Sequence, residues 1–157
     1  MKLAEFRIAL DYTPEEIWRF MFDLKNVPRW DPGVVEARLT NEPPLERVGA
    51  TIQTLGQGGK DRGTVRVADF EMYRRLVLAF VESQDEKGRV KDAKLTYIFE
   101  PVDNKTILTR VVEAEPVGVW KLLRPLISRA VEKDGRQEAA NIKSLFPAKR
   151  HAEGTYS

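Results

Sequence analysis

The chain has 157 residues, of which 42% are hydrophobic, and its 26 basic side chains nearly balance its 24 acidic ones. This length and composition predict a single globular domain with a substantial core, and the interspersed charges argue against nucleic acid as a partner. The sequence contains no cysteine, and its one histidine, His151, lies in a polar tail. Disulfides, thiolate metal sites and a serine-histidine-acid triad within the fold are therefore excluded, and we expect neither a metal nor another cofactor.

The start of the chain predicts a strand followed by two short helical segments. Apolar residues alternate with other residues from Ala4 to Leu10, as in a half-buried strand. Thr13-Pro14-Glu15-Glu16 is typical of a helix start, because it combines a capping threonine, an early proline and a glutamate three residues on. Trp30 follows, between Pro28 and Pro32, in a predicted short turn. Two interpretations of Trp30 stay open: it plugs one end of the core, or it forms an aromatic wall at the mouth of a pocket.

The middle of the chain predicts six further strands, over residues 34–41, 51–55, 64–70, 76–82, 93–100 and 106–113. For the last two strands we expect Glu100 to face Thr106 across a loop over residues 101–105, so that opposed residues share a face. This register places on the inner face Ala93, Leu95, Tyr97, Phe99, Ile107, Thr109, Val111 and Glu113.

A long helix is predicted over residues 116–146, where apolar residues recur at helical spacing. At about 1.5 Å per residue it would be roughly 46 Å long and would cross the whole molecule. Asp134, Glu138 and Asn141 interrupt its buried face. Unpaired buried carboxylates are costly, so one interpretation is a cavity holding solvent or ligand beneath this part of the helix. The alternative is that Asp134-Gly135 breaks the helix and rotates the following turn.

The order of these elements resembles that of the START-like helix-grip superfamily (SRPBCC). The resemblance includes Pro14-Glu15-Glu16-Ile17-Trp18 at the first helix and Val27-Pro28-Arg29-Trp30-Asp31-Pro32 before the second strand. Within the superfamily the chain is most similar to bacterial polyketide cyclase/dehydrase and lipid-transport proteins. The resemblance implies an α+β fold, in which a curved seven-stranded antiparallel sheet wraps around a long C-terminal helix and two short helices lie between strands 1 and 2. It also implies an apolar cavity between sheet and helix, but it transfers no catalytic residue.

Together these observations predict one helix-grip domain over residues 1–147, a flexible tail over residues 148–157 and a set of cavity-lining side chains. The predicted lining residues are Trp30, Leu95, Tyr97, Phe99, Thr109, Val111, Glu113, Ile127, Val131, Asp134 and Glu138.

Three functions remain open at this stage. The leading hypothesis is binding or transport of a small hydrophobic molecule, such as a lipid, a sterol-like compound or an aromatic polyketide. The second is a polyketide cyclase/aromatase or dehydratase, with Asp134 or Glu138 as acid or base and Tyr97 polarising a carbonyl oxygen. The third is a protein-interaction module. The charged N-terminus and the lack of a long apolar run predict a soluble protein without stable membrane insertion. The absence of cysteine is compatible with a reducing cytoplasm, and we expect the protein to be cytoplasmic.

Overall fold

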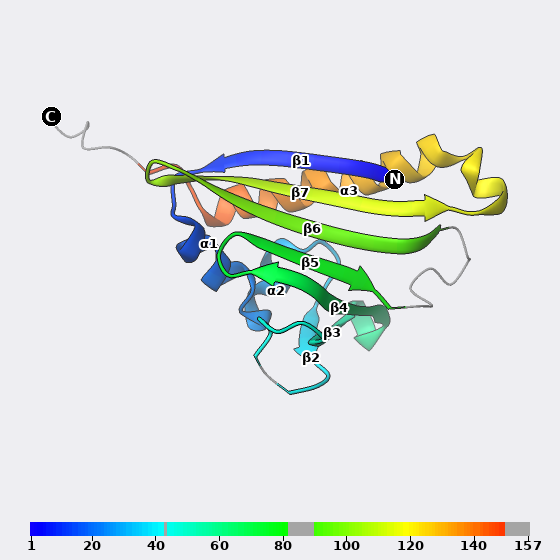
Figure 1. The fold of residues 1–157 in the computed structure, drawn as a ribbon, viewed down its shortest axis with the longest axis horizontal. Helices are drawn as coiled ribbons and strands as arrows, with labels where there is room; N and C mark the ends of the chain where they lie inside the picture. The colour runs from blue at the N-terminus through cyan, green and yellow to red at the C-terminus, as the bar shows by residue number, and fades with distance from the viewer. Residues whose placement is uncertain (43, 82–89, 150–157) are drawn as a thin grey trace, which may run out of the picture.

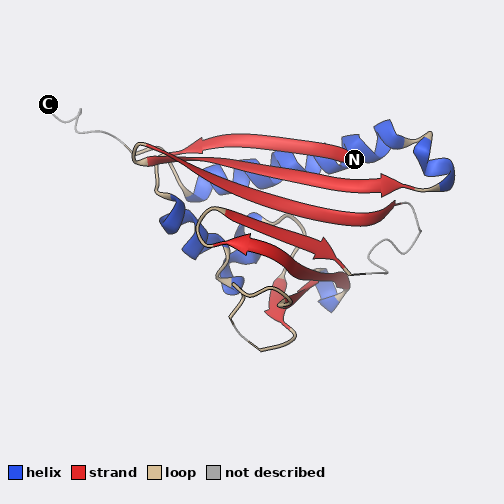
Figure 2. Ribbon diagram, in the orientation of Figure 1, coloured by secondary structure: helices blue, strands red, loops and turns tan. Residues whose placement is uncertain are grey.

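The computed structural model describes residues 1–42, 44–81 and 90–149. Seven strands form one antiparallel sheet in the order β1-β7-β6-β5-β4-β3-β2, and the long helix α3 lies along one side of it (Figures 1 and 2). The short helices lie between β1 and β2, so the predicted α+β helix-grip architecture is confirmed. In chain order the elements are β1 (Lys2–Leu10), α1 (Pro14–Met21), η1 (Leu24–Asn26), α2 (Val27–Trp30), β2 (Glu36–Leu39), β3 (Thr51–Leu55), η2 (Gln57–Gly59), β4 (Asp61–Glu71), β5 (Arg75–Phe80), β6 (Val90–Val102), β7 (Lys105–Pro116), η3 (Gly118–Lys121) and α3 (Arg124–Leu145).

Two predicted segments lie wholly or partly outside the described residues. Residues 150–157, which make up most of the expected C-terminal tail, are not described. Residue 82, the last of the strand predicted over residues 76–82, is not described either. The structure therefore describes only residues 76–81 of the predicted strand and residues 148–149 of the predicted tail.

Helix α1 begins where its capping residues predict. The backbone amide of Glu16 donates to Thr13 Oγ1 at 3.3 Å, and the Thr13 amide donates to Glu16 Oε1 at 2.9 Å. These two reciprocal bonds satisfy amides that the first helical turn leaves without partners. The helix buries Ile17, Trp18 and Met21 against the sheet.

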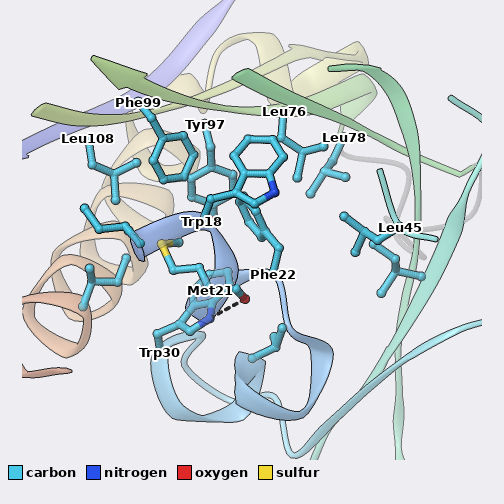
Figure 3. Close-up of a cluster of buried hydrophobic side chains, with 14 of the residues drawn as sticks. Trp18, Met21, Phe22, Trp30, Leu45, Leu76, Leu78, Tyr97, Phe99 and Leu108 are labelled. Atoms are coloured by element: carbon cyan, nitrogen blue, oxygen red, sulfur yellow. Dashed lines mark hydrogen bonds between the residues drawn. The ribbon is translucent and has the colours of Figure 1, made fainter. Parts of the chain in front are cut away.

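A cluster of aromatic side chains fills the interior beside α1 and α2 (Figure 3). Phe22 contacts Trp18 and Tyr97 edge to face, with ring centroids 4.9 and 5.6 Å away. Trp30 is only 4% exposed, and its Nε1 donates to the Met21 carbonyl oxygen at 3.0 Å. Of the two interpretations of Trp30, the structure therefore supports the plug of the core, and the interior at this end of the sheet is filled.

The prediction of one unbroken terminal helix beginning at Pro116 is wrong at its start. Strand β7 continues to Pro116, a short 3-10 turn follows, and α3 begins only at Arg124. Gly118, the first residue of this turn, has a φ of +57°, which glycine adopts without a steric penalty. Pro125 has no amide proton and is tolerated only in a first helical turn, so it fixes where α3 can begin. The alternative that the helix breaks at Gly135 is also wrong, because α3 runs through it.

The predicted register of β6 and β7 is wrong by one residue. Pro101 pairs with Thr106 and Val102 with Lys105, so the strands are joined by a tight turn rather than a five-residue loop. Asp103 adopts a φ of +57°, which the short polar Asp side chain tolerates better than most residues do.

This shift exchanges the two faces of β7, because side chains alternate along a strand. Tyr97 now pairs with Arg110, and Leu95 pairs with Val112. Three residues predicted to line a cavity therefore lie on the opposite face of the sheet from Tyr97, and the residues between them point inward instead. The misplaced residues are Thr109, Val111 and Glu113.

Candidate functional site

Three polar side chains meet beneath the middle of α3, and we call Tyr97, Arg110 and Glu138 the polar cluster. Tyr97 Oη donates to Glu138 Oε2 at 2.6 Å, and Arg110 Nη1 lies 3.3 Å from Glu138 Oε1. All three residues are buried, with Glu138 only 3% exposed. They come from β6, β7 and α3, so the sheet register and the phase of the helix together create the cluster.

Burial dominates the ionisation of the acidic members of this cluster. It raises the pKa of Glu138 to about 8, even though Arg110 and the hydrogen bond from Tyr97 act in the opposite direction. Burial and the neighbouring Glu138 also raise the pKa of Tyr97 well above its ordinary value. The raised pKa favours the protonated form of this carboxyl group at neutral pH.

Arg110 fits into this position because the facing helical residue has no side chain. A Cβ on Gly135 would lie 3.2 Å from Arg110 Nη1. The Arg110 guanidinium also lies 5.7 Å from the centre of the Phe6 ring on β1, within the range of a cation–π contact. Arg110 Nε is buried and has no hydrogen-bond partner among the described residues. A buried donor without a partner costs free energy.

A second acidic group lies near Arg110, in the segment after α2. Burial raises the pKa of Asp31 to about 6, and the positive charges of Arg62 and Arg110 oppose that rise. Arg62 Nη1 donates to the Pro32 carbonyl oxygen at 2.8 Å, which holds this second cation against the same loop.

A cavity of about 390 Å³ opens between the sheet and the first half of α3. Its walls are mostly apolar, and Arg110 and Asp134 supply its charged groups. A smaller cavity of about 160 Å³ lies towards β1 and shares Arg110 and Val112 with the first. The residues that line the larger cavity are Phe80, Leu95, Arg110, Val112, Ala130, Val131 and Asp134.

The structure distributes the predicted site residues over five places. Leu95, Val131 and Asp134 line the larger cavity. Tyr97 and Glu138 belong to the polar cluster and are not among the lining residues of that cavity. The other predicted residues fall elsewhere: Trp30 and Phe99 lie in the filled core, Ile127 is half-buried on α3, and Thr109, Val111 and Glu113 lie on the other face of the sheet.

Sequence reasoning missed Arg110, Phe80, Val112 and Ala130. The register error assigned Arg110 and Val112 to the wrong face of the sheet. Asp103-Asn104 could have indicated the correct face for these two residues, because this pair of turn-forming residues favours a tight hairpin over a five-residue loop.

The polar interruptions of α3 also have partners in the structure. Glu138 meets Tyr97 and Arg110, while Asn141 Nδ2 donates to the Trp30 carbonyl oxygen at 3.2 Å. Asp134 is exposed at the edge of the larger cavity. A cavity does lie beneath α3, but nearer its start than the positions of Glu138 and Asn141 suggested.

Comparison with known proteins supports the same fold. The protein family described as polyketide cyclase / dehydrase and lipid transport matches residues 1–147. The chain belongs to this family. A comparison with curated proteins found no match.

Solved structures with the same fold include both a biosynthetic and a plant protein. The di-domain aromatase/cyclase BexL is 24% identical, with a TM-score of 0.72 over 90% of this chain, which spans only 45% of that chain. A norcoclaurine synthase from Thalictrum flavum, solved with a transition-state analogue, is 13% identical, with a TM-score of 0.66 over 91% of this chain and 92% of that one. A protein from Thermus thermophilus is 15% identical, with a TM-score of 0.65 over 90% and 94% of the two chains.

Two further observations concern the residues that the structure describes. None of their helices combines the length and apolar content that crossing a membrane requires. Nor do these residues include a group of three or more His, Cys, Asp or Glu arranged to hold a metal ion.

Proposed function

We propose that the protein binds a small molecule with an apolar body and an acidic or otherwise hydrogen-bond-accepting group, in the cavity between the sheet and α3. Five of the lining side chains are apolar, and Arg110 contributes a positive charge to the wall. Burial of apolar ligand surface would supply affinity, and one polar group would fix orientation. The observation that carries this proposal is the Arg110 side chain, a cation that lines the cavity beside mostly apolar side chains.

The volume of the cavity narrows the class of ligand. Sites for small organic molecules span about 300 to 1,000 Å³, and a cavity of about 390 Å³ lies near the lower end of this range. A fatty acid or a fused-ring aromatic acid suits it better than an entire phospholipid. The family description, which includes both polyketide cyclisation and lipid transport, agrees with either ligand.

A direct test measures displacement of the fluorescent probe anilinonaphthalene sulfonate by matched pairs of fatty acids and fatty alcohols. We expect the acids to bind better than the alcohols, and Arg110→Met to remove most of that preference. Val112→Phe, which fills the cavity, should weaken both kinds of ligand. Val111→Phe on the neighbouring position of β7 is the matched control, because it lies on the other face of the sheet.

The proposal fails if folded wild-type protein binds none of these ligands. It also fails if Val112→Phe, shown by circular dichroism to be folded, binds them as well as Val111→Phe does.

Catalysis, as in a cyclase or dehydratase, requires an acid or base in contact with the ligand. Asp134 is the carboxylate at the cavity wall, while Glu138 lies behind Arg110 in the polar cluster. An enzyme should therefore lose turnover in Asp134→Asn with little change in ligand affinity. Loss of affinity alone in this variant would favour the binding function over the catalytic one.

A further inference from the structure

The turn between β7 and α3 exposes a stripe of aliphatic side chains at one end of the molecule. We call residues 117–129 the tip; in Figure 1 it is the yellow stretch at the right-hand end, between the end of β7 and the start of α3. Val119, Leu122 and Leu126 are 63, 81 and 55% exposed. They lie within one short stretch of chain, in η3, in the turn after it and in the first turn of α3. Large aliphatic residues exposed close together indicate a contact surface.

The same segment is strongly basic, although the whole chain is nearly neutral. Lys121, Arg124 and Arg129 are exposed, and no acidic residue occurs from Pro116 to Val131. With 26 basic and 24 acidic residues along the chain, this one-sided charge is a local feature of the tip. Aliphatic side chains flanked by cations are the composition of peptides that bind at the surface of anionic membranes.

We propose that the tip docks on a lipid bilayer that contains anionic lipids, with Leu122 and Leu126 inserted and the neighbouring cations against the headgroups. A specific protein partner is a poorer fit, because a stable protein interface buries about 800 Å² on each side and three aliphatic side chains supply only a fraction of it. The cavity begins in the next turn of α3, at Ala130 and Val131. Docking would therefore bring the cavity close to the lipid surface. Docking does not depend on the proposed ligand, since the tip and the cavity wall are made of different side chains.

The test measures binding to vesicles of phosphatidylcholine alone and of phosphatidylcholine mixed with phosphatidylglycerol. We expect clear binding to the mixed vesicles, weaker binding to the neutral ones, and a decrease with added salt because salt screens the headgroup charges. Replacing both Leu122 and Leu126 by Ser should lower the partition coefficient at least about tenfold on both vesicle types. Lys121→Gln should lower it roughly fivefold on mixed vesicles only.

The protein carries its own reporter for this experiment. Trp18 and Trp30 are 1 and 4% exposed in the core, whereas Trp120 is half-buried within the tip. A shift of tryptophan emission to shorter wavelength on vesicle addition should therefore come from Trp120, and Trp120→Phe should abolish it.

Val102→Ser is the matched control, because Val102 is another exposed aliphatic residue, at 48%, on the distant turn between β6 and β7. It should leave vesicle binding unchanged. No binding of the folded protein to mixed vesicles, or equal loss in the control, would overturn the proposal. A dimer in solution that the Leu122 and Leu126 substitutions dissociate would also overturn it, by assigning the tip to a second copy of the chain. Val112→Phe should bind vesicles normally, so failure of cavity binding and failure of docking can be distinguished.

Discussion

Glu138 should control how the stability of the protein depends on pH. Its pKa is about 8 in the folded protein, because of burial, against an ordinary value of 4.5. The folded state therefore holds this proton more tightly than the unfolded chain does. The resulting stabilisation is fully present below about pH 4.5 and is lost as the pH rises through about 8, so stability should fall across this window.

Glu138→Gln removes this titration while keeping the shape of the protonated side chain. One pKa unit corresponds to about 1.4 kcal/mol, so Glu138 contributes a slope of at most about 1.4 kcal/mol per pH unit. Over the whole window the change reaches at most about 5 kcal/mol. The free energy of unfolding, measured with urea from about pH 5 to pH 9, should be similar for both proteins at the acid end. The variant should become progressively more stable than the wild type up to about pH 8.

A second variant, Glu132→Gln, serves as the control for the comparison of wild type with Glu138→Gln. Glu132→Gln changes an exposed carboxylate on the same helix and should leave the pH slope of the wild type unaltered. Tyr97, Arg110, Asp31 and other titrating groups remain in both proteins, so they largely cancel in the difference. If the wild type instead gains stability over the variant as the pH rises, ionised Glu138 forms a stabilising pair with Arg110 and our reasoning is wrong.

Two further predictions concern the polar cluster. Tyr97→Phe removes the 2.6 Å hydrogen bond to Glu138 and leaves a buried carboxyl group with one partner fewer; we expect a loss of about 1 to 3 kcal/mol in urea unfolding at neutral pH, and no loss would argue against this bond. The affinity for a fatty acid should fall as the pH rises through about 8, because ionised Glu138 then competes for the charge of Arg110; titration calorimetry should show this dependence in the wild type and not in Glu138→Gln.

The order of elements could be predicted from the sequence because each element carries a local signal. The cap at Thr13 fixes the first helix, and alternation from Ala4 to Leu10 fixes the first strand. Pro125 also indicates where α3 starts. Apolar residues upstream of it recur at helical spacing, and they led to the prediction of an earlier start. Periodicity alone does not distinguish a helix from a nearby exposed turn with similar spacing.

The site was harder to predict because it depends on relations between elements. The tight turn at Asp103 shifts the pairing of β6 and β7 by one residue from the predicted register. This shift decides which face of β7 carries Arg110. Nothing in the alternation of that strand reveals this choice, since both faces contain apolar and polar residues. The position of the cavity depends likewise on how far α3 lies from the sheet, which is set by side-chain volumes across the whole interior.

Gly135 shows how a local helix preference and the packing between two elements act on the same residue. In isolation it weakens a helix by about 1 kcal/mol, and a break at this glycine was one of the two interpretations of the sequence. In the structure the missing side chain gives space to the Arg110 guanidinium, which a Cβ would approach to 3.2 Å. A fold that needed only a stable helix would be better served by alanine at this position. The glycine is therefore best explained by the space that it leaves for the buried cation.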